Sequence, residues 1–333
     1  MSKQTVVVIG ASGVIGGGHV RRLAGRDNVD VIALSRRPLG VDAANLLTLP
    51  VDLADPVADL APLGPVTHAV YCAYAAADGE EAQRAANAAL CESALALLER
   101  ACPRLQHVTL LQGMKAYGSH LGPFRTPAKE SDPRHQGPNF YFDQEDALAA
   151  RAARHGWRWA VLRPHVVVGP AWRSPMNLAA VLTAYGLDRR ARGLPFSFPG
   201  PEAAFDIVYQ ATDADLLSRA IEWAGTLEVS GEAFNITNGD FFRWRNAWPR
   251  LAAVFDLDPA GPEPRRLTEE MAGAPTPDGL EVSWAFADYV FHTTWDVMAD
   301  TLKCRRHGFL EFLDSEAMLV DRCAEMRRLI GQT

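Results

Sequence analysis

Three glycines spaced three residues apart follow a short apolar strand, and this pairing constrains the fold more than any other feature of the chain. The β-branched run at residues 5–9 is typical of a strand buried on both faces of a parallel sheet. The glycines lie where this strand gives way to a helix, and such a turn lets the backbone approach a pyrophosphate whose charge is met by the helix amides. A glycine-rich turn that binds nothing is the alternative. The residues predicted to contact a dinucleotide here are Gly10, Ser12, Gly13, Val14, Ile15 and Gly16.

Short apolar strands alternate with helices over the first 170 residues. Helices are expected at residues 14–24, 80–101 and 139–155, with Gly156 as the C-terminal cap of the last one. Strands are expected at residues 5–9, 28–34, 45–50, 67–72, 105–111 and 159–168. This alternation predicts right-handed βαβ units and therefore an α/β fold with a doubly wound parallel sheet of the Rossmann type.

The end of the second strand indicates which dinucleotide would bind. Ser35, Arg36 and Arg37 stand where a site for NAD would hold an acidic residue for the ribose hydroxyl. Two guanidinium groups and a hydroxyl suit a 2′-phosphate instead, so this segment favours NADPH as the cofactor. A solvated pair of surface arginines is the alternative. Asp52 and Leu53, just after the third strand, are expected near the adenine.

The alternation of strands and helices ends after Gly169, where proline-rich and aromatic-rich connections begin. We therefore expect an NADP-binding Rossmann domain at residues 1–170 and a smaller lobe at 171–333 that mainly binds substrate. A segment near residues 204–240 is expected to return to the Rossmann core through a helix at 213–223 and a strand at 234–236. The stretch 258–264, rich in proline and glycine, is interpreted as a surface loop.

The overall composition narrows the classes of partner. The chain has 33 basic and 40 acidic side chains, a net charge of -7, and its arginine pairs are scattered, so a nucleic-acid or anionic-membrane partner is disfavoured. It has no apolar run long enough to span a bilayer and no signal-peptide pattern at its start, so we expect a cytoplasmic protein. Its five cysteines are dispersed without the spacing of a metal site and are interpreted as buried or free thiols.

The sequence lacks the Tyr-x-x-x-Lys motif that ordinary short-chain dehydrogenases use for proton transfer beside the nicotinamide. Of the four lysines, none has a tyrosine four residues before it; they are Lys3, Lys115, Lys129 and Lys303. Lys115 and Tyr141 are therefore the candidates for the proton chemistry. From the residues alone, the first could equally be a surface lysine and the second a core aromatic between two phenylalanines.

Six stretches spread over almost the whole chain resemble one protein family. They are Gly113-Met114-Lys115-Ala116-Tyr117 with Leu121-Gly122-Pro123-Phe124, Asn139-Phe140-Tyr141-Phe142 with Glu145-Asp146, Arg163-Pro164 with Ser174-Pro175-Met176-Asn177, the segment 196–200, Ala233-Phe234-Asn235-Ile236-Thr237-Asn238-Gly239-Asp240 with Trp244, and His307-Gly308-Phe309-Leu310-Glu311-Phe312. The chain thus resembles the progesterone 5β-reductase and iridoid synthase family, an atypical branch of the extended short-chain dehydrogenases/reductases. The strings around Tyr141 and Asn235 are specific to that family.

The resemblance implies an NADPH-dependent enzyme that reduces the carbon–carbon double bond of a small apolar α,β-unsaturated carbonyl compound, and it would suggest a homodimer. The family's tyrosine matches Tyr141, whose hydroxyl would stabilise the enolate as hydride reaches the β-carbon, and its lysine matches Lys115, whose ammonium would lower the phenol pKa. The residues implied to face the nicotinamide side of the cofactor are Ala73, Tyr74, Gln112, Tyr141, Val167, Ser174 and Met176. The residues implied to line an apolar substrate pocket are Phe124, Phe196, Phe198 and Phe309, although aromatics are often plain core.

The chain departs from the family near the predicted site. It has extra residues around 118–120, Ala116 stands where relatives often have histidine, and Tyr74 where they often have tryptophan. The substrates of family members therefore cannot be assigned to this chain. Two other functions stay open at this point: a 1,2-reductase of carbonyls or an extended short-chain enzyme acting on sugar nucleotides, and a sensor that binds NADP(H) without turnover.

Overall fold

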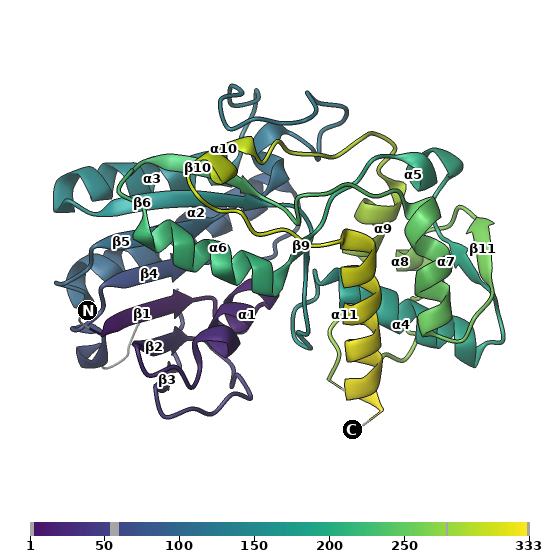
Figure 1. Cartoon of the computed structure of the whole chain (residues 1–333), viewed down its shortest axis with the longest axis horizontal. Coiled ribbons are helices and arrows are strands. Elements are labelled where there is room, and N and C mark those ends of the chain that lie inside the picture. Colours follow the sequence, from purple (N-terminus) through teal and green to yellow (C-terminus); the bar gives the residue numbers. More distant parts are fainter. Residues whose placement is uncertain (1–2, 54–59, 278, 332–333) are drawn as a thin grey trace.

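The computed structural model describes residues 3–53, 60–277 and 279–331. Its centre is a seven-stranded sheet whose neighbouring strands all run parallel (Figure 1). In spatial order the strands are β10 (Glu232–Ile236), β6 (Arg158–Pro164), β5 (His107–Leu111), β4 (His68–Tyr71), β1 (Gln4–Ile9), β2 (Val29–Leu34) and β3 (Leu46–Leu49). The order reverses between β1 and β4. This sheet confirms the predicted doubly wound α/β fold, and the strand expected at 234–236 forms its edge beside β6.

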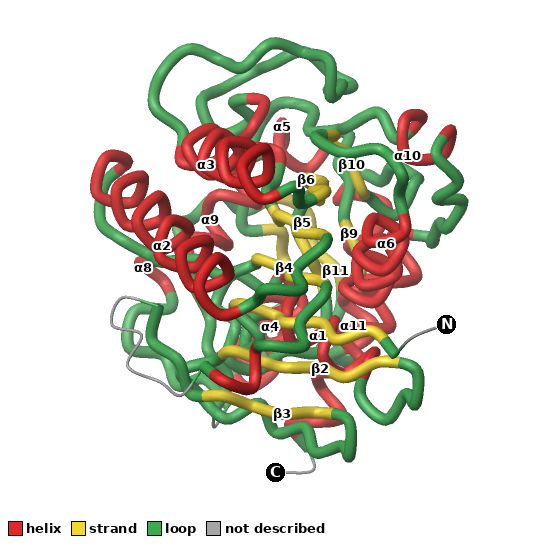
Figure 2. The backbone as a smooth tube through the Cα atoms, turned by 90° about the vertical axis from the view of Figure 1, so that its left-hand side faces the viewer, coloured by secondary structure: helices red, strands yellow, loops and turns green. Residues whose placement is uncertain are grey.

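Helices cover both faces of the sheet (Figure 2). On one face lie α2 (Glu80–Ala101) and α3 (Phe140–His155), and on the other lie α1 (Val14–Leu23) and α6 (Ala214–Thr226). Residues 5–9 of the central strand are buried because helices pack on both sides of it, which is why residues 6–9 are all apolar. Gly156 ends α3 in the left-handed conformation, with φ of +73°, as its position predicted.

The strand predicted at 159–168 is in fact two elements. β6 ends at Pro164, and β7 (Val167–Val168) pairs with β9 (Thr212–Asp213) outside the main sheet. Between them Val166 has φ of +34°, which is rare for a β-branched residue. The backbone therefore turns away from the sheet at His165 and Val166, directly at the carboxyl end of β6.

The rest of the chain forms a mostly helical body beside one end of the sheet (Figure 1). Its helices are α4 (Leu178–Ala191), α5 (Glu202–Asp206), α7 (Trp244–Val254), α8 (Leu267–Glu270), α9 (Trp284–His292) and α11 (Ser315–Ile330), while the short α10 (Leu302–Arg306) lies against β10. The stretch interpreted as a surface loop contains β11 (Pro259–Pro262), which pairs with β8 (Phe196–Phe198). That interpretation was wrong because the pairing partner lies more than 60 residues earlier in the chain.

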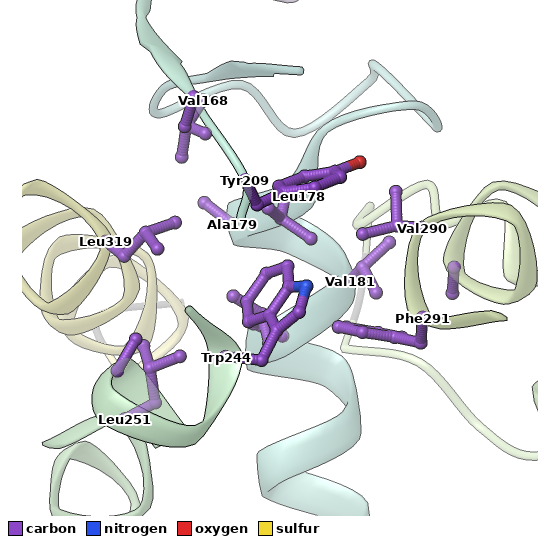
Figure 3. Packing of buried hydrophobic residues seen from close by; sticks show 14 of the residues in the cluster. Val168, Leu178, Ala179, Val181, Tyr209, Trp244, Leu251, Val290, Phe291 and Leu319 are labelled. Atoms are coloured by element: carbon purple, nitrogen blue, oxygen red, sulfur yellow. The ribbon is translucent and has the colours of Figure 1, made fainter. Parts of the chain in front are cut away.

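A large aromatic core holds this helical body together. Figure 3 shows Trp244 among apolar side chains that include Val181, Leu251 and Phe291. Phe196 and Phe198 are fully buried in the same core, the first stacked 4.5 Å from Trp248 and the second edge-to-face with it. Their expected place in a substrate pocket is therefore corrected, because both rings are enclosed by core side chains. Within the described part of the chain, no helix is both long and apolar enough to cross a membrane.

Candidate active site

The turn between β1 and α1 lies at the switch point of the sheet, where the carboxyl ends of β1 and β4 meet. Gly10 has φ of +88°, and a Cβ atom there would lie 2.6 Å from the backbone nitrogen of Ala73, just beyond β4. A Cβ atom on Gly16 would overlap the carbonyl oxygen of Gly10. These two glycines are thus required by close backbone contact. In open parallel sheets this crevice is where dinucleotides bind.

The N-terminus of α1 faces this crevice. Its N-cap, Gly13, has no side chain to accept a hydrogen bond, and the first turn carries no acidic residue, so an anion would be favoured there. The hydroxyl of Ser174 accepts a hydrogen bond from the Val14 N–H at 3.1 Å. Ile15 and Val167 pack on the same small cluster as Val14. The structure therefore brings Ser174 and Val167 to the turn between β1 and α1, although Ser174 is 160 residues further along the chain than Val14.

The predicted ribose end of the site is a cavity of about 460 Å³, lined by residues 35–42 with Thr48 and Pro50. Ser35 is buried, and its hydroxyl is engaged with the backbone of Arg37 at 2.8 and 3.2 Å. Arg36 is exposed, whereas Arg37 is half-buried and pairs with Glu281. Asp52 is exposed and Leu53 is buried at the end of the described segment. Two guanidinium groups in one cavity fit a 2′-phosphate.

Asn139 holds the two candidates for proton chemistry together. Tyr141 lies in the first turn of α3, and Lys115 lies in the short 3-10 helix η2 (Met114–Tyr117) after β5. The Tyr141 N–H donates to Asn139 Oδ1 at 3.0 Å, and Asn139 Nδ2 donates to the Lys115 carbonyl at 2.8 Å. One buried side chain thus fixes the backbone of both residues. Its role as a positioning residue was not predicted, although it belongs to the stretch that carries the resemblance.

A second set of hydrogen bonds holds the backbone of Tyr141. Gln112 Nε2 donates to the Tyr141 carbonyl at 2.8 Å, and its Oε1 accepts from Arg163 Nε at 3.2 Å. Arg163 is buried and also pairs with Glu145 at 3.0 Å. The predicted residue Gln112 is therefore adjacent to Tyr141, while Arg163 and Glu145 had no predicted role. Both lie in stretches that resemble the family, and that was the signal available for them.

Burial shifts the pKa of the phenol further from neutral pH. It raises the pKa of Tyr141, Tyr74 and Tyr289 add to the rise, and Arg163 opposes it. The resemblance implied that Lys115 would lower the pKa of this phenol, so the observed direction is the opposite. Burial lowers the pKa of Lys115 itself, and Glu80 partly opposes that change. The hydroxyl therefore stays protonated at neutral pH, which suits a hydrogen-bond donor rather than a base.

The hydroxyl of Tyr141 faces the extended backbone at Gly113, where an added Cβ atom would lie 3.3 Å from it and 3.4 Å from the Pro164 carbonyl. Tyr74 is half-buried, with its ring 6.2 Å from that of Phe140. Tyr289, on α9, adds to the polar surroundings of the phenol and was not predicted from the sequence. The predicted nicotinamide end of the site thus draws on the segments after β4 and β5 and on β6, α3 and α9.

The remaining predicted contacts are placed as follows. Phe124 is half-buried against the aromatic core, so its role at a pocket stays a prediction. Phe309 is 5% exposed and packs 5.4 Å from Trp223 in the core beneath α6. It therefore belongs to the sheet's hydrophobic core, which corrects its expected place in the substrate pocket. Met176 is 40% exposed in the loop before α4.

Comparison with known protein families matches residues 6–291 to the PRISE-like Rossmann-fold domain. The chain belongs to the PRISE family. This name covers the progesterone 5β-reductase and iridoid synthase-like proteins, so the resemblance noted in the sequence is confirmed. At this level of detail the chain is an NAD(P)-dependent oxidoreductase of the PRISE family.

Several curated proteins are similar over much of the chain. A short chain dehydrogenase of Penicillium aethiopicum is 30% identical, with 98% of each chain covered. An (S)-8-oxocitronellyl enol synthase of Antirrhinum majus is 28% identical over 98% of this chain and 92% of the relative. A 3-oxo-Δ4,5-steroid 5β-reductase of Arabidopsis thaliana is 30% identical over 79% of this chain and 74% of the relative.

Solved structures show the same fold at lower sequence identity. A UDP-N-acetylglucosamine 4-epimerase from Methanobrevibacter ruminantium superposes with a TM-score of 0.71 at 16% identity, covering all of both chains. A UDP-glucuronic acid 4-epimerase from Bacillus cereus, solved with NAD, has a TM-score of 0.72 at 13% identity, covering 98% of this chain and 100% of that one. At these identities the likeness concerns the fold alone.

Proposed function

We propose that the chain is an NADPH-dependent ene reductase that reduces the carbon–carbon double bond of enones and enals by 1,4-addition. The observation that carries the proposal is the environment of Tyr141. Tyr141 is half-buried, and Asn139 ties its backbone to that of Lys115 in a chain that lacks Tyr-x-x-x-Lys. The similarity to proteins named as a steroid 5β-reductase and as enol synthases supports it.

The residues of the site suit the charge that develops in this reaction. When bound, the cofactor supplies a hydride for the β-carbon of the substrate. Negative charge then grows on the carbonyl oxygen, and the Tyr141 hydroxyl donates a hydrogen bond that strengthens as the enolate forms. The raised pKa keeps this donor protonated. The role we assign to Lys115 is to add positive charge on this side of the site, and water can protonate the α-carbon.

The arginines favour the phosphorylated cofactor. Arg36 and Arg37 line the cavity at the ribose end, where their guanidinium groups can bind a 2′-phosphate. The half-buried Phe124 and the aromatic core behind it suit a small apolar substrate. We also propose a cytoplasmic location and a homodimer, as expected from the sequence and the family resemblance.

Tyr141→Phe tests the proposal directly. With 2-cyclohexen-1-one and an acyclic enal as substrates, we expect NADPH oxidation to fall by about 100-fold or more, because one oxyanion donor is lost. Binding of NADPH, measured by calorimetry, should change little. Tyr71→Phe is the matched control, since it removes a buried hydroxyl of β4 that has no hydrogen-bond partner among the residues the structure describes.

Product analysis by mass spectrometry separates the alternatives. A saturated ketone or aldehyde supports ene reduction. An allylic alcohol would instead indicate 1,2-reduction of the carbonyl. Tight NADPH binding without turnover of any enone, enal or carbonyl would indicate a protein that binds the cofactor as a sensor, and a large loss of NADPH affinity in Tyr141→Phe would contradict the role given to the phenol.

A further inference from the structure

Glu281, from a distant segment, forms an ion pair with Arg37, one of the arginines expected to bind the 2′-phosphate. Glu281 precedes α9, and its Oε1 lies 2.5 Å from Nη1 of Arg37. The two residues are 244 positions apart in the sequence. Both side chains are partly exposed, at 41% for Arg37 and 40% for Glu281, and Arg37 lines the ribose cavity.

Backbone hydrogen bonds hold Glu281 in this position. Its N–H donates to the Trp172 carbonyl at 2.8 Å, and two residues later the Ser283 N–H donates to the Pro175 carbonyl at 2.9 Å. Ser283 also caps α9 by accepting from the Phe286 N–H at 3.2 Å. The carboxylate therefore belongs to an anchored segment, 279–283, rather than to a loose loop tip.

This segment follows the cofactor crevice from one end toward the other. Trp172 and Pro175 flank Ser174, whose hydroxyl bonds to the N-terminus of α1. At its far end the segment enters α9, which carries Tyr289 beside the phenol of Tyr141. Glu281 is thus fixed at the adenosine end of the same crevice that holds the reacting end.

The carboxylate has opposite effects on the two forms of the cofactor. A 2′-phosphate carries a charge of about -2 near neutral pH and would have to share Arg37 with a carboxylate of the same sign. A 2′-hydroxyl can instead donate a hydrogen bond to a carboxylate, as it does in sites that prefer NAD. The glutamate therefore opposes the preference that Arg36 and Arg37 create.

We propose that Glu281 is a residue that sets cofactor specificity: by holding Arg37 it weakens binding of the 2′-phosphate and supports binding of a 2′-hydroxyl. It narrows the preference for NADPH over NADH. The inference rests on the proposed nicotinamide cofactor site but not on the choice of substrate, so binding measurements without turnover can test it.

The test is calorimetric binding of 2′,5′-ADP and 5′-AMP, then of NADPH and NADH, to the full chain and to Glu281→Gln. We expect the variant to bind 2′,5′-ADP and NADPH about three- to tenfold more tightly, because an exposed ion pair and a repulsive contact are both removed. Binding of 5′-AMP and NADH should be unchanged or weaker. Glu269→Gln, which removes the same charge from an exposed position on α8, should match the wild type.

A double-mutant cycle with Arg37→Gln ties the effect to the ion pair, because the gain from Glu281→Gln should shrink once Arg37 is absent. An unchanged ratio of 2′,5′-ADP to 5′-AMP affinity in Glu281→Gln would overturn the inference. Equal tightening of both nucleotides would also overturn it, since that is a general charge effect. If the wild type binds neither the nucleotides nor the dinucleotides, the cofactor site of the proposed function is itself wrong.

Discussion

The glycines of the turn after β1 differ in how much space the fold leaves for a side chain. A Cβ atom on Gly16 would overlap the Gly10 carbonyl oxygen and lie 2.9 Å from the Ala11 Cα. Gly16→Ala must therefore move α1 away from the turn, and we expect it to lower the free energy of unfolding by about 1–3 kcal/mol and to weaken dinucleotide binding. Chemical denaturation and calorimetry measure the two effects.

Gly13→Ala is the matched control for this change. A Cβ atom there would lie 3.6 Å from the Gly10 carbonyl oxygen, which is ordinary van der Waals contact. We expect this variant to fold with a stability close to that of the wild type. Equal destabilisation by both substitutions would mean that the loss reflects the backbone freedom of glycine and not the close contact described here.

At single residues, some features could be predicted from the sequence and others could not. The spacing of the glycines and the choice of Lys115 and Tyr141 could be read from local strings. The direction of the Tyr141 pKa could not, because it depends on burial in the folded chain and on Tyr74 and Tyr289, which are distant in the sequence. For the same reason the pairing of Arg37 with Glu281 has no signal in either segment.

Among the elements, the junction of η2 and α3 is the one that the proposed chemistry depends on. Asn139→Ala removes the cap of α3 and the bond to the Lys115 carbonyl. We expect a loss of about 1 kcal/mol in stability, typical of a lost cap. The turnover number with 2-cyclohexen-1-one should fall at least about tenfold, because Tyr141 and Lys115 lose their shared support.

Two variants separate positioning from stability. Asp314→Ala removes the cap of α11, which accepts from the Ala317 N–H, and should cost a similar amount of stability without changing turnover. Asn139→Asp keeps an acceptor for the Tyr141 N–H but loses the donor to the Lys115 carbonyl, so it should recover part of the activity. If Asp314→Ala reduced turnover as strongly as Asn139→Ala, the positioning role would be refuted.

Elements with a local signal were predicted well, and those that depend on remote pairing were not. The helix expected at 80–101 is observed with the same bounds, since its Ala- and Leu-rich composition is a local signal. The break in the strand predicted at 159–168 depends on the strained Val166 and on pairing with β9. β11 likewise depends on its pairing with β8. From its proline-rich sequence alone, only a loop was predicted.

Across the whole molecule, several histidines are buried in places that keep them neutral. Burial lowers the pKa of His19 to about 4 and the pKa values of His107 and His165 to about 3. In the unfolded chain the pKa of histidine is about 6.5. Between these values only the unfolded state takes up the proton, so stability is lost as the pH falls below about 6.5 and the loss continues toward the folded-state pKa values.

His107→Gln isolates one of these contributions, because His107 lies at the start of β5, away from the proposed site. Relative to the wild type, its free energy of unfolding should decline less between pH 6.5 and 5, by about 1–2 kcal/mol for one such histidine. Urea titrations at both pH values measure this difference. The same replacement at the exposed His307 is the control and should keep the wild-type dependence. An equal decline in the wild type and His107→Gln would show that His107 is not held neutral by the fold.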